Sequence, residues 1–119
     1  MTDEAIEQEI QAKGLTAPRV TPQTIEDTII GQTFFIAADA AKGLPQDAFE
    51  DHSPFRALKL LTICVLVLRN GFTVTGESAC ASPDNFDAEL GRKIARQKAV
   101  EKIWPLEGYL LRQKLHDVA

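Results

Sequence analysis

Residues 60–75 read LLTICVLVLRNGFTVT, in which Asn70-Gly71 separates two runs of β-prone residues. Asn-Gly between such runs is the strongest short-range signal for a β-hairpin, because both residues tolerate the positive φ angles of a type I′ turn. A two-residue turn at this point would place Val67 opposite Val74. The stretch therefore predicts an antiparallel hairpin that anchors the rest of the fold.

A long helix is predicted directly after the hairpin. Ser82 can cap its start and Pro83 can occupy its first turn. Pro105 cannot donate a backbone hydrogen bond, so we expect a kink after Trp104 and a second segment over residues 106–115. Ala95 and Ala99 keep part of the buried stripe of this helix narrow, and Gly91 and Gly108 permit close approach of another backbone. The large apolar residues of the stripe are Phe86, Leu90, Ile94, Ile103, Leu106 and Leu110.

The first half of the chain carries weaker signals. Residues 5–13 favour a helix that Gly14 ends, and Thr21-Pro22 favours the start of a second helix that reaches Gly31. Residues 32–38 indicate a third strand, although their alanine-rich end also suits a helix. Residues 40–57 contain Gly43, Pro45 and Pro54 without a clear period, which predicts a loop or insertion.

These elements predict an α+β fold in a single domain spanning residues 1–119. Residues 1–20 form an N-terminal helix and linker, residues 40–57 the loop, and residues 58–116 the hairpin-helix core. The first hairpin strand is apolar on both faces, so one face needs the C-terminal helix and the other an N-terminal helix or another subunit. A homo-oligomer is therefore expected.

Composition excludes several classes of protein. The formal net charge of -4 argues against general nucleic-acid binding. The longest apolar run, residues 60–68, is far shorter than the ~20 residues that cross a bilayer, and the acidic start lacks a signal peptide's basic region. We therefore expect no membrane partner and a place in the cytosol.

Two cysteines are present, and the expected register keeps them apart. Cys64 would face Glu77, and Cys80 would lie opposite Leu61. This offset of three rungs exceeds the reach of a disulfide bond. Free thiols in a reducing compartment are the expected state.

Four segments share a pattern that resembles a known family. They are residues 61–66, residues 70–80 (NGFTVTGESAC), residues 85–95 (NFDAELGRKIA) and residues 103–111 (IWPLEGYLL). The pattern, which covers about half the chain, is similar to the gene-product-forty-nine family of small tailed-phage and prophage proteins. The resemblance implies phage origin and action in the cytoplasm of the bacterial host, and it implies no particular activity.

Candidate catalytic residues lie in the segment Gly76-Glu77-Ser78-Ala79-Cys80. It partly matches a nucleophile elbow, but Cys80 replaces the final glycine and only His52 and His116 could serve as bases. Cys80 or Ser78 as nucleophile, with Glu77 nearby, is therefore the alternative interpretation. A buried cysteine and an ion pair of Glu77 with Arg69 or Arg92 are favoured.

The main binding candidates are cationic. Arg92 and Arg96 lie one helical turn apart and could grip an anion, with Lys93 at the edge. The alternative is a solvated face balanced by acidic neighbours, which is the commoner use of such patterns. Trp104 and Tyr109 could stack on a base or fill the core. No metal-ligand spacing and no cofactor motif are evident.

We therefore expect binding rather than catalysis. The leading hypothesis is a non-virion phage accessory protein that takes part in host takeover or counter-defence by holding a host protein or an anionic, nucleotide-like small molecule. The alternatives are a small hydrolase or transferase using Cys80 or Ser78, and a virion-associated structural protein.

Overall fold

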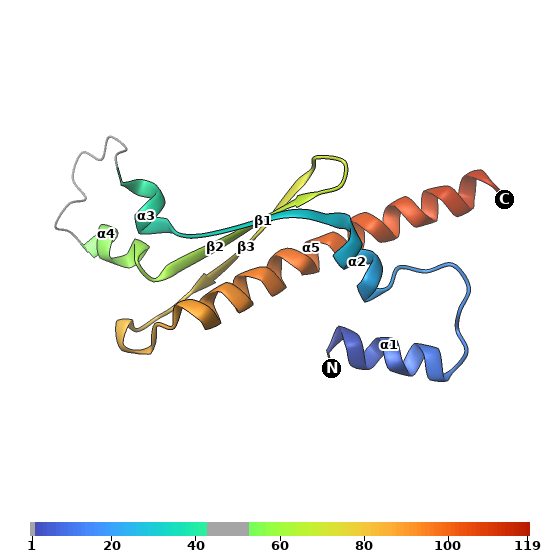
Figure 1. Ribbon diagram of the computed structural model, residues 1–119, viewed down its shortest axis with the longest axis horizontal. Coiled ribbons are helices and arrows are strands. Elements are labelled where there is room, and N and C mark those ends of the chain that lie inside the picture. The colour runs from blue at the N-terminus through green and yellow to red at the C-terminus, as the bar shows by residue number, and fades with distance from the viewer. Residues whose placement is uncertain (1, 43–52) are drawn as a thin grey trace.

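A three-stranded antiparallel sheet and one long helix build the computed structural model, which describes residues 2–42 and 53–119. The strands lie in the order β1, β2, β3 and the helix α5 crosses one face of the sheet (Figure 1). This arrangement confirms the expected α+β class. The elements, in chain order, are α1 (Asp3–Ala12), α2 (Pro22–Thr28), β1 (Ile29–Ile36), α3 (Ala37–Ala41), α4 (Ser53–Leu58), β2 (Leu61–Leu68), β3 (Thr73–Ala79), a 3₁₀ turn η1 (Pro83–Asn85) and α5 (Ala88–Asp117).

The β2–β3 hairpin is confirmed, but its predicted register is wrong by one residue. Val67 pairs with Thr73 rather than Val74, because the loop contains three residues. The Gly71 amide donates to the Leu68 carbonyl at 2.8 Å, and Gly71 alone in the loop takes a positive φ, 90°. Such a loop combines an ordinary turn with a glycine bulge. A shift of one residue exchanges the two faces of β3, so Gly76 instead of Glu77 lies across from Cys64.

The ends of the elements before the hairpin also differ from the predicted ends. Helix α2 ends at Thr28, short of the expected Gly31, because the chain at Ile29 begins to pair with Leu68 of β2. The third strand is confirmed, but Ala37 belongs to the short helix α3. Helices α3 and α4 occupy parts of the predicted loop, whose residues 43–52 lie outside the described residues.

The side of α5 that lies on the sheet contains Ala95, Ala99 and Ile103 of the predicted stripe but not its leucines. A Cβ atom at Gly76 of β3 would stand 2.1 Å from the Ala95 carbonyl oxygen and 2.4 Å from the Ala99 amide nitrogen. The helix backbone therefore rests directly on the strand. The predicted stripe residues Leu90 and Leu110 are 53% and 52% exposed. The fully buried positions are Gly91, Ala95, Ala99 and Ile103.

The start of α5 differs from the prediction as well. Ser82 precedes the 3₁₀ turn η1, and Asp87 caps α5 by accepting a hydrogen bond from the Leu90 amide at 2.9 Å. The helix continues through Pro105 instead of dividing there. Proline removes only the hydrogen bond to the carbonyl of Glu101, which lies on an exposed side of the helix.

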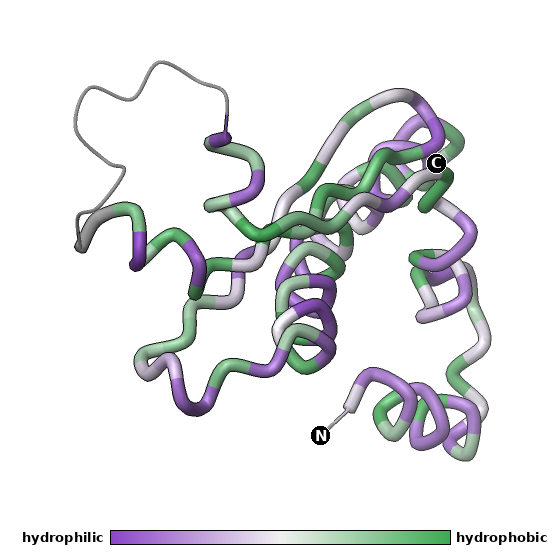
Figure 2. The backbone as a smooth tube through the Cα atoms, turned by 60° about the vertical axis from the view of Figure 1, so that its left-hand side comes forward, coloured by the Kyte–Doolittle hydropathy of each residue, from purple (hydrophilic) through white to green (hydrophobic). Residues whose placement is uncertain are grey.

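The core lies between α5 and the inner face of β2. Cys64, Leu66 and Leu68 point toward the helix and are buried, as is Ile25 of α2. The colours of Figure 2 show hydrophobic residues concentrated along the strands, while α5 alternates between hydrophilic and hydrophobic positions. The two cysteines are free, which confirms the expectation of unpaired thiols.

Helix α1 is attached to this core by polar contacts. It contributes no buried residue. Arg19 binds the Glu7 carboxylate through both guanidinium nitrogens, and these hydrogen bonds, with one from Gln11, lower the pKa of Glu7 to about 2. The Trp104 indole donates to Asp3 at 3.2 Å. Among the helices described, none is long and apolar enough to cross a membrane.

Thr62 is expected to tolerate loss of its hydroxyl. Its side chain is 2% exposed and faces Gly91, and its Oγ1 has no hydrogen-bond partner within the described residues. An unpaired buried hydroxyl costs free energy that an isosteric methyl group does not. Thr62→Val should leave the free energy of unfolding unchanged or raise it by about 1 kcal/mol in urea denaturation. A decrease of more than about 1 kcal/mol in the free energy of unfolding would mean that the Thr62 hydroxyl has a hydrogen-bond partner in solution.

Candidate functional site

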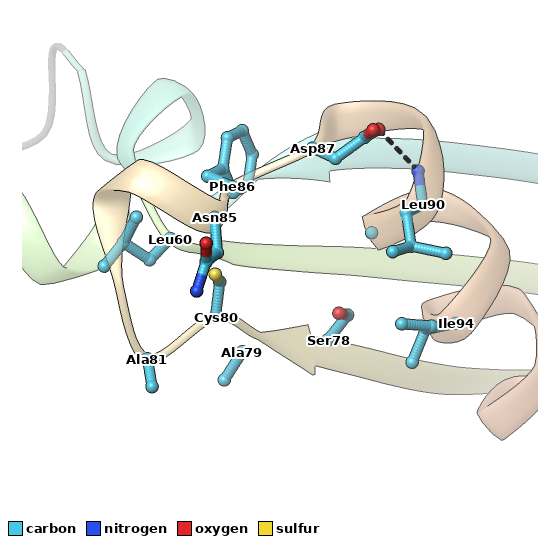
Figure 3. Close-up of a pocket in the computed structure, with 11 residues that line it drawn as sticks. Leu60, Ser78, Ala79, Cys80, Ala81, Asn85, Phe86, Asp87, Leu90 and Ile94 are labelled. Atoms are coloured by element: carbon cyan, nitrogen blue, oxygen red, sulfur yellow. Dashed lines mark hydrogen bonds between the residues drawn. The ribbon is translucent and has the colours of Figure 1, made fainter.

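A pocket of about 270 Å³ opens where β3 leads into the start of α5 (Figure 3). Its walls are mostly apolar, and they gather residues from both sides of the 3₁₀ turn. We name it the β3–α5 pocket; its lining comprises Leu60, Ser78, Ala79, Cys80, Ala81, Asn85, Phe86, Asp87, Leu90, Gly91 and Ile94.

The chemistry of the β3–α5 pocket is that of neutral and acidic groups. Ser78 and Cys80 line it, whereas Glu77 pairs with Ile63 on the opposite face of the sheet. The Cys80 thiol donates to the Ser82 carbonyl at 3.1 Å, and the nearby helix end is capped by the Asp87 carboxylate. A thiolate needs a cationic neighbour, and the pocket lining contains none.

His116 is not placed to assist Ser78 or Cys80. His116 lies in the last turn of α5, and the rise of an α-helix puts it about 40 Å from the first turn. His52 lies outside the described residues. Within the described residues, Glu77 forms neither of the expected ion pairs: Arg69 lies 3.8 Å from Glu107 instead, and Arg92 belongs to α5 on the other side of the sheet.

The three predicted anion-binding residues differ in the partners that they already have. Arg96 donates to both carboxylate oxygens of Glu26, at 2.8 and 3.1 Å, and to Gln32 at 2.8 Å. The hydrogen bonds to Glu26 raise the pKa of Arg96. Lys93 pairs with Glu89 along the helix at 3.4 Å and stays 71% exposed, and Arg92 is exposed as well. The guanidinium expected to hold a ligand thus already holds a carboxylate.

The predicted aromatic pair is also separated. Trp104 is half-buried, packs against the core and donates to Asp3 of α1. Tyr109 is 73% exposed on α5. The two rings therefore do not form one stacking platform.

A second pocket, of about 390 Å³, lies between α2, the hairpin loop and the last turns of α5. We name it the α2–α5 pocket. Arg19, Arg69 and Lys114 bring positive charge to its lining, and Glu107 and Asp117 bring negative charge. The remaining lining residues are Val20, Thr24, Leu110, Leu111 and Gln113.

The cations of the α2–α5 pocket differ in how firmly they are held. Arg19 is bound to Glu7. Arg69 has a 64% exposed side chain and only a long contact, 3.8 Å, with the nearly buried Glu107, whose oxygen also accepts a hydrogen bond from Thr28 at 2.9 Å. Lys114 is exposed in the last turn of α5. Arg69 and Lys114 are therefore accessible to an anion.

Two further pockets are lined by more acidic than basic side chains. One contains Glu4 and Glu7 with Arg19, and the other contains Asp3 and Glu7 beside Trp104. Of the pockets compared, the α2–α5 pocket thus suits an anion best. No group of three metal-ligating side chains occurs in residues 2–42 and 53–119.

Comparison with known proteins adds one finding. The model of the phage protein family described as N4 Gp49/phage Sf6 gene 66 matches residues 20–115. The match includes the whole lining of the β3–α5 pocket and all of the α2–α5 pocket except Arg19 and Asp117, and it leaves α1 outside. Searches of curated proteins and of solved structures found no match.

Proposed function

Because the chain belongs to the N4 Gp49/phage Sf6 gene 66 family, we propose that it is a non-virion accessory protein that binds a small anionic, nucleotide-like molecule without transforming it. It acts in the cytoplasm of the infected bacterium, where removing such a molecule from circulation counters a host defence. Self-association belongs to the same proposal.

The observation that carries this proposal is the lining of the α2–α5 pocket. Its volume, about 390 Å³, falls within the range of small-molecule sites. Arg69 presents a forked set of donors that suits a phosphate, and Lys114 adds a second charge. Val20 and Leu111 provide an apolar wall for an uncharged part of the ligand. We propose this site in place of the cluster of Arg92, Lys93 and Arg96, because the Arg96 guanidinium already binds Glu26.

A hydrolase or transferase is the second candidate function. It is supported by the presence of Ser78 and Cys80 in the wall of the β3–α5 pocket. It is weakened by the thiol's hydrogen bond to a carbonyl and by the distance to His116, since nucleophilic catalysis needs a base within hydrogen-bond reach.

The proposal is tested by calorimetric titration with adenosine diphosphate and with inorganic pyrophosphate. The double variant Arg69→Gln/Lys114→Gln should bind at least about 10-fold more weakly than the wild type, because it loses charge-assisted hydrogen bonds. The matched control Arg92→Gln/Lys93→Gln removes the same charge elsewhere and should bind like the wild type. Equal weakening in both variants, or no binding of either probe to the wild type at millimolar concentration, would contradict the proposal.

A further inference from the structure

One residue in the wall of the α2–α5 pocket, Glu107, is a carboxylate with few hydrogen-bond donors. Its side chain is 12% exposed, so most of its surface is withdrawn from water. Its Oε1 atom lies 2.9 Å from the Thr28 hydroxyl and 3.8 Å from an Arg69 nitrogen. Its Oε2 atom has no hydrogen-bond partner among the residues that the structure describes.

The Thr28 hydroxyl does not fully satisfy this carboxylate. Thr28 is 3% exposed at the end of α2, and its hydroxyl also lies 3.0 Å from the Thr24 carbonyl oxygen. A hydroxyl carries one proton, so it donates fully to only one of these two acceptors at a time. Withdrawing a carboxylate from water costs free energy unless donors replace the water. Glu107 therefore offers at least one acceptor position to a donor that enters the pocket.

Arg69 does not fill that position. Its guanidinium nitrogen is 3.8 Å from Oε1, beyond hydrogen-bond distance, and its side chain is 64% exposed. The Arg69 amide donates to the Thr28 carbonyl at 2.8 Å and so fixes the start of the hairpin loop to the end of α2, which lies beside α5 (Figure 1). The guanidinium remains free to turn toward a ligand. A phosphate bound by Arg69 would thus lie close to Glu107.

The group of the ligand that faces Glu107 has to be a neutral donor. A phosphate at this point would be repelled by the carboxylate, which itself accepts hydrogen bonds and donates none. In a nucleotide the neutral donors nearest to the phosphates are the sugar hydroxyls, whereas an amino group of the base lies at the far end of the molecule. Carboxylates accept hydrogen bonds from ribose hydroxyls in dinucleotide-binding folds.

We infer that Glu107 determines the specificity of the α2–α5 pocket by accepting a hydrogen bond from a sugar hydroxyl of the ligand. The pocket then takes ribonucleotides in preference to nucleotides that lack these hydroxyls. This inference rests on the proposed function, because Arg69 and Lys114 hold the phosphates. It adds the class of ligand and its orientation, with the sugar against Glu107 and the phosphates toward the two cations.

Calorimetric titration with a matched pair of nucleotides tests the inference. Adenosine diphosphate and its 2′,3′-dideoxy analogue carry the same base and the same phosphates and differ only in the two hydroxyls. The wild type should bind adenosine diphosphate at least about 10-fold more tightly, because the analogue leaves the carboxylate without a donor. Glu107→Gln should reduce this preference to about two-fold or less, because the amide places N–H donors where the carboxylate accepted.

Asp117→Asn is the matched control. It removes the same charge from the lining of the same pocket, but the Asp117 side chain is 62% exposed and already accepts a hydrogen bond from Gln113 at 2.8 Å. This variant should keep the preference of the wild type. Circular dichroism establishes that each variant is folded. If Glu107→Gln fails to fold, the comparison of the two nucleotides on the wild type decides the inference.

Pyrophosphate separates the failure of this inference from the failure of the proposed function, since its binding needs the cations but no sugar. A wild type that binds pyrophosphate and binds the two nucleotides equally would overturn the inference alone. So would a folded Glu107→Gln variant that retains the full preference for adenosine diphosphate. A wild type that binds none of the three probes would contradict the proposed function and the inference together.

Discussion

Replacing Gly76 with alanine should lower the free energy of unfolding by about 3 kcal/mol. The added Cβ atom would stand 2.1 Å from the Ala95 carbonyl oxygen and 2.4 Å from the Ala99 amide nitrogen. These are backbone atoms of a helix, which cannot rotate aside as a flexible side chain can. Overpacking of this kind costs about 1–3 kcal/mol even where side chains give way. Urea denaturation followed by circular dichroism measures the loss.

Gly108→Ala is the matched control. Gly108 lies within α5, and a Cβ atom there would meet nothing within 4 Å. Alanine is favoured over glycine in a helix by about 0.5–1 kcal/mol, so this variant should be more stable than the wild type. Glycine to alanine is thus expected to lower the free energy of unfolding at position 76 and to raise it at position 108. A Gly76→Ala variant that is as stable as the wild type would show that α5 does not rest on Gly76.

Leu66→Ala should lower the free energy of unfolding by about 3 kcal/mol. Leu66 is 0% exposed in the central strand and packs beneath α5, so truncation removes buried apolar contacts and leaves a cavity. Val65→Ala changes the neighbouring residue, which is half-buried on the face of the sheet turned away from α5. This variant should lower the free energy of unfolding by about 1 kcal/mol or less.

The contrast between Leu66→Ala and Val65→Ala tests which face of β2 is covered. Equal costs for the two variants would show that both faces of β2 are covered within one chain.

Local signals in the sequence predicted the elements but not how they meet. The hairpin followed from Asn70-Gly71, yet its register depended on a loop of three residues instead of two, which the dipeptide alone does not distinguish. Ala95, Ala99 and Ile103 of the predicted stripe are buried, whereas Leu90 and Leu110 were included because periodicity counts large apolar residues. The close contact of this side of α5 with the sheet depends on Gly76, a residue of another element.

The same limit applies to the sites. Ser78 and Cys80 were identified because they are neighbours in sequence, and both line the β3–α5 pocket. Arg69 and Lys114 carried no such signal, since they come from the hairpin loop and the last turn of α5 and meet only when the chain folds. Arg96 looked available because Glu26, which binds it, lies 70 residues away.

Native mass spectrometry of the protein purified from infected cells tests the central claim most directly. The wild type is predicted to retain a small molecule whose mass and fragmentation identify a phosphate-bearing, nucleotide-like anion. Arg69→Gln/Lys114→Gln should lose this molecule, while Arg92→Gln/Lys93→Gln should keep it. A wild type that carries no small molecule, or a first double variant that retains it fully, would contradict binding at the α2–α5 pocket.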